Sequence, residues 1–167
     1  MIVPAGDKVL AFSVVAQEAL FQGALVRFNA TPEGRLGVFK VAATTDISNF
    51  GAFMAYYITP DSEDVEYVGA PESATFTLNT DTGVGGGTHT IASGTECVAL
   101  GGSKIALMRV DGNSLYDTPT DLSSYAPATV LKAHTDGYLA LDADDNLDVA
   151  SALVIENHGN SIVVLLA

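Results

Sequence analysis

The residues that could carry chemistry in this chain are few and lie far apart. Its 167 residues include three histidines, His89, His134 and His158, and a single cysteine, Cys97. The histidines show no metal-binding spacing, and no Gly-x-Ser-x-Gly nucleophile elbow is present. Triad partners meet in space, so sequence spacing alone does not rule out a triad, but we interpret the three as ordinary turn histidines. Cys97 lies in a β-type run with no helix N-terminus nearby, and we interpret it as a buried, inert thiol.

Two loops have compositions that suggest ion binding. The stretch Asp142 to Asp148 places carboxylates or amides at positions one, three and five, as at the start of a calcium loop. Position six is Leu147, where the turn requires glycine, and position twelve is Leu153, where a bidentate glutamate belongs. The glycine-rich stretch 82–88 lacks the Gly-Lys-Ser/Thr sequence of a phosphate-binding loop. We predict a solvated turn and an exposed, mobile loop, with no metal, no cofactor and no enzymatic activity.

Composition and charge narrow the classes of partner. The chain carries 20 acidic and 7 basic residues, a net charge of −13, and the basic residues are scattered. The sequence therefore predicts no nucleic-acid partner and no membrane binding. Only 16% of the residues are charged and 48% are hydrophobic. Either large protein–protein contacts or a surface rich in Thr, Ser, Asn and Gly would fit this composition.

The elements that would position these residues are strands. β-Branched and aromatic residues occur in short runs punctuated by Gly, Asn, Asp-Gly and Pro, and helical periodicity is almost absent. Only residues 16–21 contain helix formers in sequence, and this stretch is too short for a stable helix. Strands are expected near residues 8–15, 24–28, 35–42, 50–58, 64–68, 74–79, 88–92, 96–100, 104–110, 129–133, 137–142, 149–156 and 161–166.

The length and the pattern predict one all-β domain, a small β-barrel or β-meander with an N-terminal extended arm and an inserted β subdomain. We assign the arm to residues 1–22, a first β-meander to 23–70, a middle β subdomain with a connector to 71–127, and a C-terminal β-meander completing the barrel to 128–167. A hairpin is expected around Gly101-Gly102. The aliphatic run 162–166 would promote aggregation if exposed, so it should lie inside a sheet or against a partner.

Aromatic residues give little indication of a sugar-binding platform. The chain has no tryptophan, and its six tyrosines are dispersed along the sequence. We interpret them as core and interface packing residues.

Four short motifs form a set in the last third of the chain. They are Val130–Ala133, Asp136–Leu141, Val149–Val154 and Ile162–Leu166, preceded far upstream by Pro4–Asp7, Val9–Phe12 and Gly23–Val26. This layout resembles the C-terminal meander and N-terminal arm of tailed-bacteriophage capsid decoration proteins, also called cement proteins. The resemblance covers residues 129–167 fairly well, 4–28 loosely and the middle hardly at all.

The resemblance implies a structural virion protein that binds the outer surface of a phage capsid and cements neighbouring capsomers. Its partners would be the major capsid protein and further copies of itself, as a homotrimer. It would be made in the host cytoplasm and reside on the outer capsid surface. The partner-binding residues are expected in the N-terminal arm, at Met1, Ile2, Val3, Pro4, Val9, Leu10 and Phe12.

Other functions also fit this sequence. A tail-tube or head-fibre subunit belongs to the same class, and a carbohydrate-binding or adhesive β module to another. A β-barrel hydrolase that uses one histidine is a third alternative.

Overall fold

The computed structural model describes residues 2–6, 8–46, 51–56, 65–68, 75–78, 90–102 and 104–167, with the backbone alone for 3–4, 65–68 and 75–78. Apart from one short 3-10 helix, η1 (Gly112–Ser114), the regular structure of these residues is β-strand. The all-β prediction is therefore confirmed. Within the described residues, no helix is long and apolar enough to cross a membrane.

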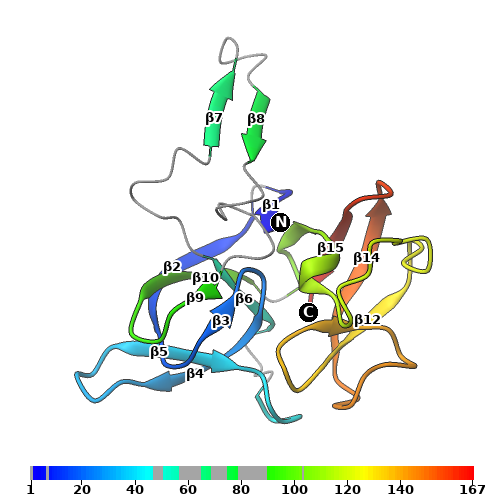
Figure 1. Cartoon of the computed structure of the whole chain (residues 1–167). Coiled ribbons are helices and arrows are strands. Elements are labelled where there is room, and N and C mark those ends of the chain that lie inside the picture. Colours follow the sequence, from blue (N-terminus) through cyan, green and yellow to red (C-terminus); the bar gives the residue numbers. More distant parts are fainter. Residues whose placement is uncertain are drawn as a thin grey trace.

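Five strands form a closed barrel (Figure 1). They are β2 (Leu10–Ala16), β4 (Leu25–Ala30), β5 (Leu36–Lys40), β6 (Phe53–Tyr56) and β10 (Glu96–Gly101), joined in the order β10-β2-β5-β4-β6. The β2–β5 pair is parallel and the other pairs are antiparallel, with β10 and β6 closing the ring. Gly101 allows close approach at this closure, because a Cβ there would lie 2.4 Å from the Ala52 carbonyl oxygen.

Six strands form a second, open sheet in the order β1-β11-β15-β14-β12-β13, with every pair antiparallel. The strands are β1 (Ile2–Pro4), β11 (Leu107–Val110), β12 (Val130–Ala133), β13 (Leu139–Ala140), β14 (Ala150–Asn157) and β15 (Ile162–Leu166). The register shifts between Leu131 and Lys132 and between Val154 and Glu156. Such irregularities bend a sheet, as expected where it curves around a core.

Two small sheets complete the topology. Strand β3 (Leu20–Phe21) pairs with β9 (Thr90–Ile91), and β7 (Val65–Val68) pairs with β8 (Thr75–Leu78), both antiparallel. Strand β7 lies at the end of the predicted first β-meander, and β8 lies in the predicted middle β subdomain.

The barrel strands are apolar on both sides, because side chains alternate across a strand. Their inward side chains form one buried cluster, which includes Val14, Val38, Phe53 and Cys97. Their outward side chains join the inner face of the open sheet in a second and larger cluster: Leu25, Met54 and Leu100 from the barrel meet Met108, Val164 and Leu166 from the sheet. The open sheet is thus packed directly onto the barrel wall.

Backbone hydrogen bonds also connect the barrel to the open sheet. The amide of Leu25 donates to the Gly137 carbonyl at 2.7 Å, and the amide of Ala52 donates to the Ala167 carbonyl at 2.7 Å. Gly137 has a φ of +85°, and a Cβ there would lie 3.0 Å from the Leu25 oxygen. This close approach and the positive φ both favour glycine.

Strand positions were predicted better than strand partners. Each of the expected strands overlaps an observed one, but β1 and β3 were not assigned as strands. The expected hairpin around Gly101-Gly102 is wrong, because β10 pairs within the barrel and β11 within the open sheet. The C-terminal strands are not a simple meander either, since β12 lies between β13 and β14. The glycine-rich stretch 82–88 and His89 fall outside the described residues.

The predicted arm contributes to both sheets. Ile2 is 0% exposed and belongs to the larger cluster, while Val9 packs partly against that cluster. Phe12 lies against the barrel cluster, 5.4 Å from the Phe53 ring centre, and Leu10 is 55% exposed. Met1 is outside the described residues, and Val3 and Pro4 are described as backbone only. Partner binding by these residues remains a prediction.

We predict that Ile2→Ala destabilises the fold by roughly 2–5 kcal/mol, because it opens a cavity in the shared core. The matched change Leu10→Ala, at an exposed position of the same predicted arm, should alter stability by no more than about 0.5 kcal/mol. Urea unfolding of both variants measures the difference. Equal and small effects would mean that the first strand is not part of the cooperative core.

Candidate functional site

The outer face of the open sheet carries aliphatic side chains as well as charged ones, whereas its inner face is apolar. In β15 the inner residues Ile162, Val164 and Leu166 are fully buried against the barrel. The alternate residues, Val163 and Leu165, point to the opposite face. An antiparallel sheet with one solvated face normally alternates apolar and polar residues, whereas a continuous apolar run is typical of a strand covered on both sides.

One apolar row crosses four strands of this outer face. The register places Leu107 opposite Leu165, Leu165 opposite Leu153, and Leu153 opposite Val130. The three leucines are partly exposed and Val130 is 46% exposed. None of the four belongs to either buried cluster of the described residues. We call these four residues the outer row.

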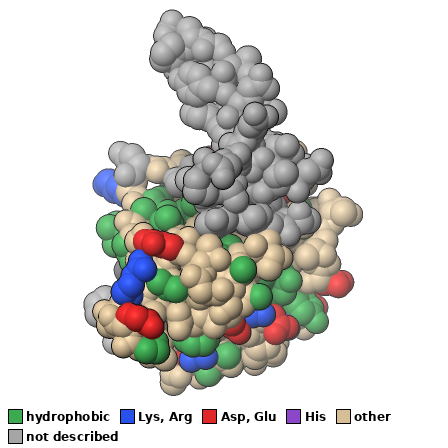
Figure 2. All heavy atoms as spheres, turned by 60° about the vertical axis from the view of Figure 1, so that its left-hand side comes forward, with side chains coloured by type: hydrophobic (Ala, Val, Ile, Leu, Met, Phe, Trp, Pro, Cys, Tyr) green, Lys and Arg blue, Asp and Glu red, His purple; other side chains and the backbone are tan. Residues whose placement is uncertain are grey.

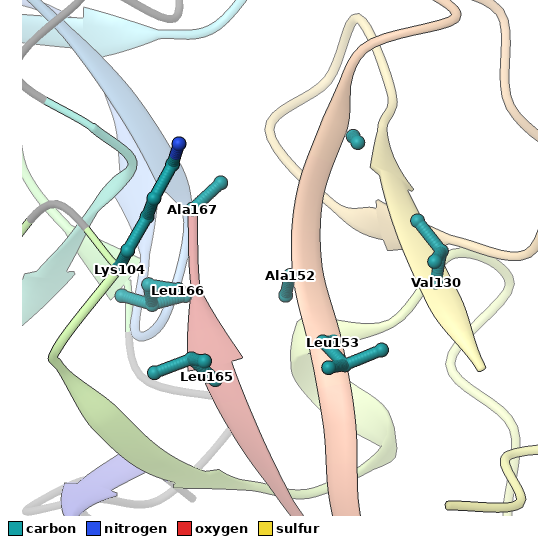
Figure 3. Close-up of a pocket in the computed structure, with 8 residues that line it drawn as sticks. Lys104, Val130, Ala152, Leu153, Leu165, Leu166 and Ala167 are labelled. Atoms are coloured by element: carbon teal, nitrogen blue, oxygen red, sulfur yellow. The ribbon is translucent and has the colours of Figure 1, made fainter. Parts of the chain in front are cut away.

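A shallow groove of about 270 Å³ lies along the outer row (Figure 3). It is lined by Lys104, Val130, Ala150, Ala152, Leu153, Leu165, Leu166 and Ala167. Figure 3 shows Leu165, Leu153 and Val130 on three neighbouring strands, with the Lys104 side chain extending beside Ala167. The groove therefore offers aliphatic surface with one positive charge at its margin.

Lys104 is held in place by its backbone. Its φ is +59°, and its amide donates to the Leu166 carbonyl at 3.2 Å. Its side chain forms no ion pair with any described residue. A cation at the end of an apolar groove is available to a partner carboxylate.

The opposite end of the outer face carries a mixed polar cluster. Arg109 on β11 lies beside the loop after β14, where its Nη2 is 3.3 Å from His158 Nε2. His158 Nε2 is also 2.9 Å from Glu156 Oε2. The cluster contains one cation and one anion besides the imidazole, so it is close to electrically balanced when the histidine is neutral.

A second apolar patch adjoins the first residues of β2. Leu10, 55% exposed, and Ile105, 51% exposed, both lie against Gly102, within 3.6 and 3.5 Å of where a Cβ would stand. Leu10 was predicted as partner-binding, and Ile105 was not. Ile105 was missed because this contact depends on the fold: the turn at Gly102 brings the end of the barrel to the start of β11.

The acidic turn contains an internal cation. Lys132 on β12 donates to Asp142 and to Asp148, and its Nζ is 3.9 Å from Asp145 Oδ1. The carboxylates raise the pKa of Lys132, chiefly through these hydrogen bonds, and the same contact lowers the pKa of Asp148. Of the candidate calcium ligands at positions one, three and five, Lys132 contacts only Asp142, and the Asn146 amide instead bonds Thr135. Among the described residues, no group of three or more His, Cys, Asp or Glu is arranged to hold a metal.

The described histidines and the cysteine are not brought together. His134 lies at the turn that Gly137 closes, with its ring stacked on Tyr116 at 4.1 Å, while His158 belongs to the Arg109 cluster. Cys97 is buried inside the barrel, and burial raises the pKa of its thiol to about 11. The expectation that Cys97 is buried is confirmed, and its predicted inertness remains a prediction.

The fold gathers aromatic side chains that are distant in the sequence. Phe21 stacks on Tyr138 at 4.3 Å between ring centres, and Tyr116 lies edge-on to Tyr138 at 6.5 Å. Together with His134 they form one cluster where β3 meets the open sheet. Only Tyr116, at 38% exposure, is among the exposed large hydrophobic residues. The cluster was missed because Phe21 is more than ninety residues away from its other members in the sequence.

Charged side chains are dispersed on the barrel side of the molecule. The face drawn in Figure 2 shows acidic and basic side chains in small groups, some of them side by side, among apolar and neutral surface. One such ion pair joins Arg35 and Glu96 at 2.9 Å, with both side chains more than half exposed. Exposed pairs of this kind contribute little to stability, so this side has the character of a solvated surface.

Comparison with known proteins gives little further information. No protein-family model matches the chain, and no curated protein matches it. Among solved structures, the chain is similar to the crystal structure of the head fiber gp8.5 N base in bacteriophage phi29, with a TM-score of 0.46 and 11% identity, covering 96% of this chain and 95% of that one. A TM-score this low does not establish a shared fold, so the likeness carries no argument about function.

We predict that Lys132→Gln raises the pKa of Asp148 toward its ordinary value near 3.8, because the hydrogen bond that favours the charged carboxylate is lost. In the wild type this contact stabilises the fold above that pH and is lost as the pH falls through the lower folded-state pKa. The stability advantage over Lys132→Gln should therefore shrink on acidification. Carboxyl-detected NMR titration measures the pKa, with Asp144→Asn as the control that leaves Asp148 unchanged.

Proposed function

We propose that this chain is a structural virion protein of a tailed bacteriophage that binds the outer capsid surface and cements neighbouring capsomers. The observation that carries the proposal is the outer row, a line of partly exposed aliphatic side chains across four strands of the open sheet. The C-terminal resemblance to decoration proteins covers the same strands, because motifs 130–133, 149–154 and 162–166 supply β12, β14 and β15.

The outer row has the character of an assembly surface. Complete burial of a leucine or valine side chain is worth about 1.5–3 kcal/mol, and the row residues are already partly covered. A partner over the four residues would therefore gain a few kcal/mol from the row alone. Such a contribution is useful only when many copies act together or when further contacts surround the row, as on a repetitive shell.

The acidity of the chain also supports this proposal. A net charge of −13 disfavours contact with packaged DNA and favours an exposed location. Leu10 and Ile105 supply a further apolar contact beside the N-terminal strand. Cementing requires contacts with more than one neighbour. The outer row and the Leu10–Ile105 patch are separate surfaces, so one can contact another copy of this chain while the other faces the shell.

The proposal is tested by co-sedimentation with expanded shells assembled from the major capsid protein of the same genome. We expect saturable binding, at least a tenfold loss of affinity for Leu10→Asp, and little change for Leu36→Asp. Leu36 is the matched control because it is also a leucine, 41% exposed, but lies on barrel strand β5.

Absence of saturable binding to these shells would contradict the capsid proposal. Assembly into hexameric rings would then favour a tail-tube subunit. Selective binding on a glycan array by a monomer would favour an adhesive module, with the Tyr116 cluster as the first place to look.

A further inference from the structure

We propose that the outer face of the open sheet packs against the same face of a second copy of this chain, around a two-fold axis parallel to the strands. This inference concerns self-association and does not depend on binding to a capsid. It commits the groove of Figure 3 to a second copy and leaves the Leu10–Ile105 patch to other partners.

The outer row is self-complementary about the β14–β15 pair. Its order across the sheet is Leu107, Leu165, Leu153 and Val130. An axis between β14 and β15 places Leu165 over Leu153 of the second copy, and Leu107 over its Val130. Every row position then meets an aliphatic side chain, and the two sheets form an aligned sandwich.

The charges that flank the row complement each other under the same axis. Lys104, beside β11 and β15, forms no ion pair among the described residues. At the same end of the sheet, Lys132 on β12 is outnumbered by Asp142, Asp145 and Asp148. The two-fold axis exchanges the β11 side for the β12 side, so Lys104 of each copy approaches the surplus carboxylates of the other.

The relation between Lys104 and the acidic turn follows from the pairing. The Lys104 amide binds the Leu166 carbonyl, Leu166 is opposite Ala152, and Ala150 is opposite Lys132. Lys104 and Ala150 also line the same groove. Asp142 and Asp148 are more than four-fifths exposed, so their carboxylates remain accessible to a second copy while bonded to Lys132.

The area of the outer face sets the expected affinity of the dimer. Four strands spaced by about 4.8 Å span roughly 14 Å, and five residues along a strand span roughly 17 Å. This flat area is well below the approximately 800 Å² that each partner contributes to a standard interface. The outer row is therefore the centre of the contact, and Ile155 and the acidic turn must supply its rim. A dimer with a dissociation constant in the micromolar range is expected.

Sedimentation equilibrium and light scattering of the purified chain test the proposal. We expect a mass that rises with concentration from 17.3 kDa to twice that value and stops there. Val130→Asp should raise the dissociation constant at least tenfold, because it places a charge over Leu107 of the second copy. Leu36→Asp, an equally exposed site away from the sheet, should leave it unchanged. Circular dichroism and thermal unfolding verify that both variants fold.

Substitutions of Lys104 test the charge contact between Lys104 and the acidic turn separately. Lys104→Glu should weaken the dimer severalfold, and Lys104→Arg should retain it. A chain that stays at 17.3 kDa at every concentration, a mass that reaches three times that value, or a dimer indifferent to Val130→Asp would each overturn the two-fold contact.

Discussion

The structure depends on one packing interaction, the burial of the open sheet against the outer wall of the barrel. Met54 and Leu100 leave the barrel strands on the side opposite Phe53 and Cys97, so each of these strands serves two cores. A small barrel with one interior cluster would bury little surface for its length. Sharing its wall with the sheet adds the largest cluster of the described residues and fixes the relative position of the two sheets.

This arrangement explains why the outer face of the sheet becomes important. The strands that cover the barrel wall must be apolar on their inner side, but this requirement does not apply to Leu107, Leu153 and Leu165. The usual solution for an exposed antiparallel sheet is polar residues at such positions. Retaining leucines there costs solubility in a monomer, and a stable partner removes that cost. The high negative charge of the chain counteracts nonspecific association through the same face.

The sequence allowed the strands to be located, but it did not allow the pairing to be predicted. β-Branched runs and turn residues mark where a strand begins and ends because these are local preferences. Pairing depends on contacts between distant segments: β10 and β11 are separated by a short turn and still enter different sheets. The aromatic cluster of Phe21, Tyr116 and Tyr138 was hidden for the same reason. Alternation did not show which face of β15 would pack against the barrel, because the whole strand is aliphatic.

Lys132 and Lys104 differ in whether neighbouring carboxylates neutralise their charge. The charge of Lys132 is used within its own turn, whereas the charge of Lys104 is available to a partner. Lys132 is surrounded by carboxylates of its own turn, and these raise its pKa and hold it protonated. Lys104 lies in the connection between β10 and β11, and it has an aliphatic groove beside it instead of carboxylates. The same turn that satisfies Lys132 keeps an excess of negative charge in solvent. At one end of this face lie an acidic excess and a lysine that forms no ion pair among the described residues. A second copy can satisfy this pattern in both directions at once, whereas a partner without this symmetry could satisfy it only in part.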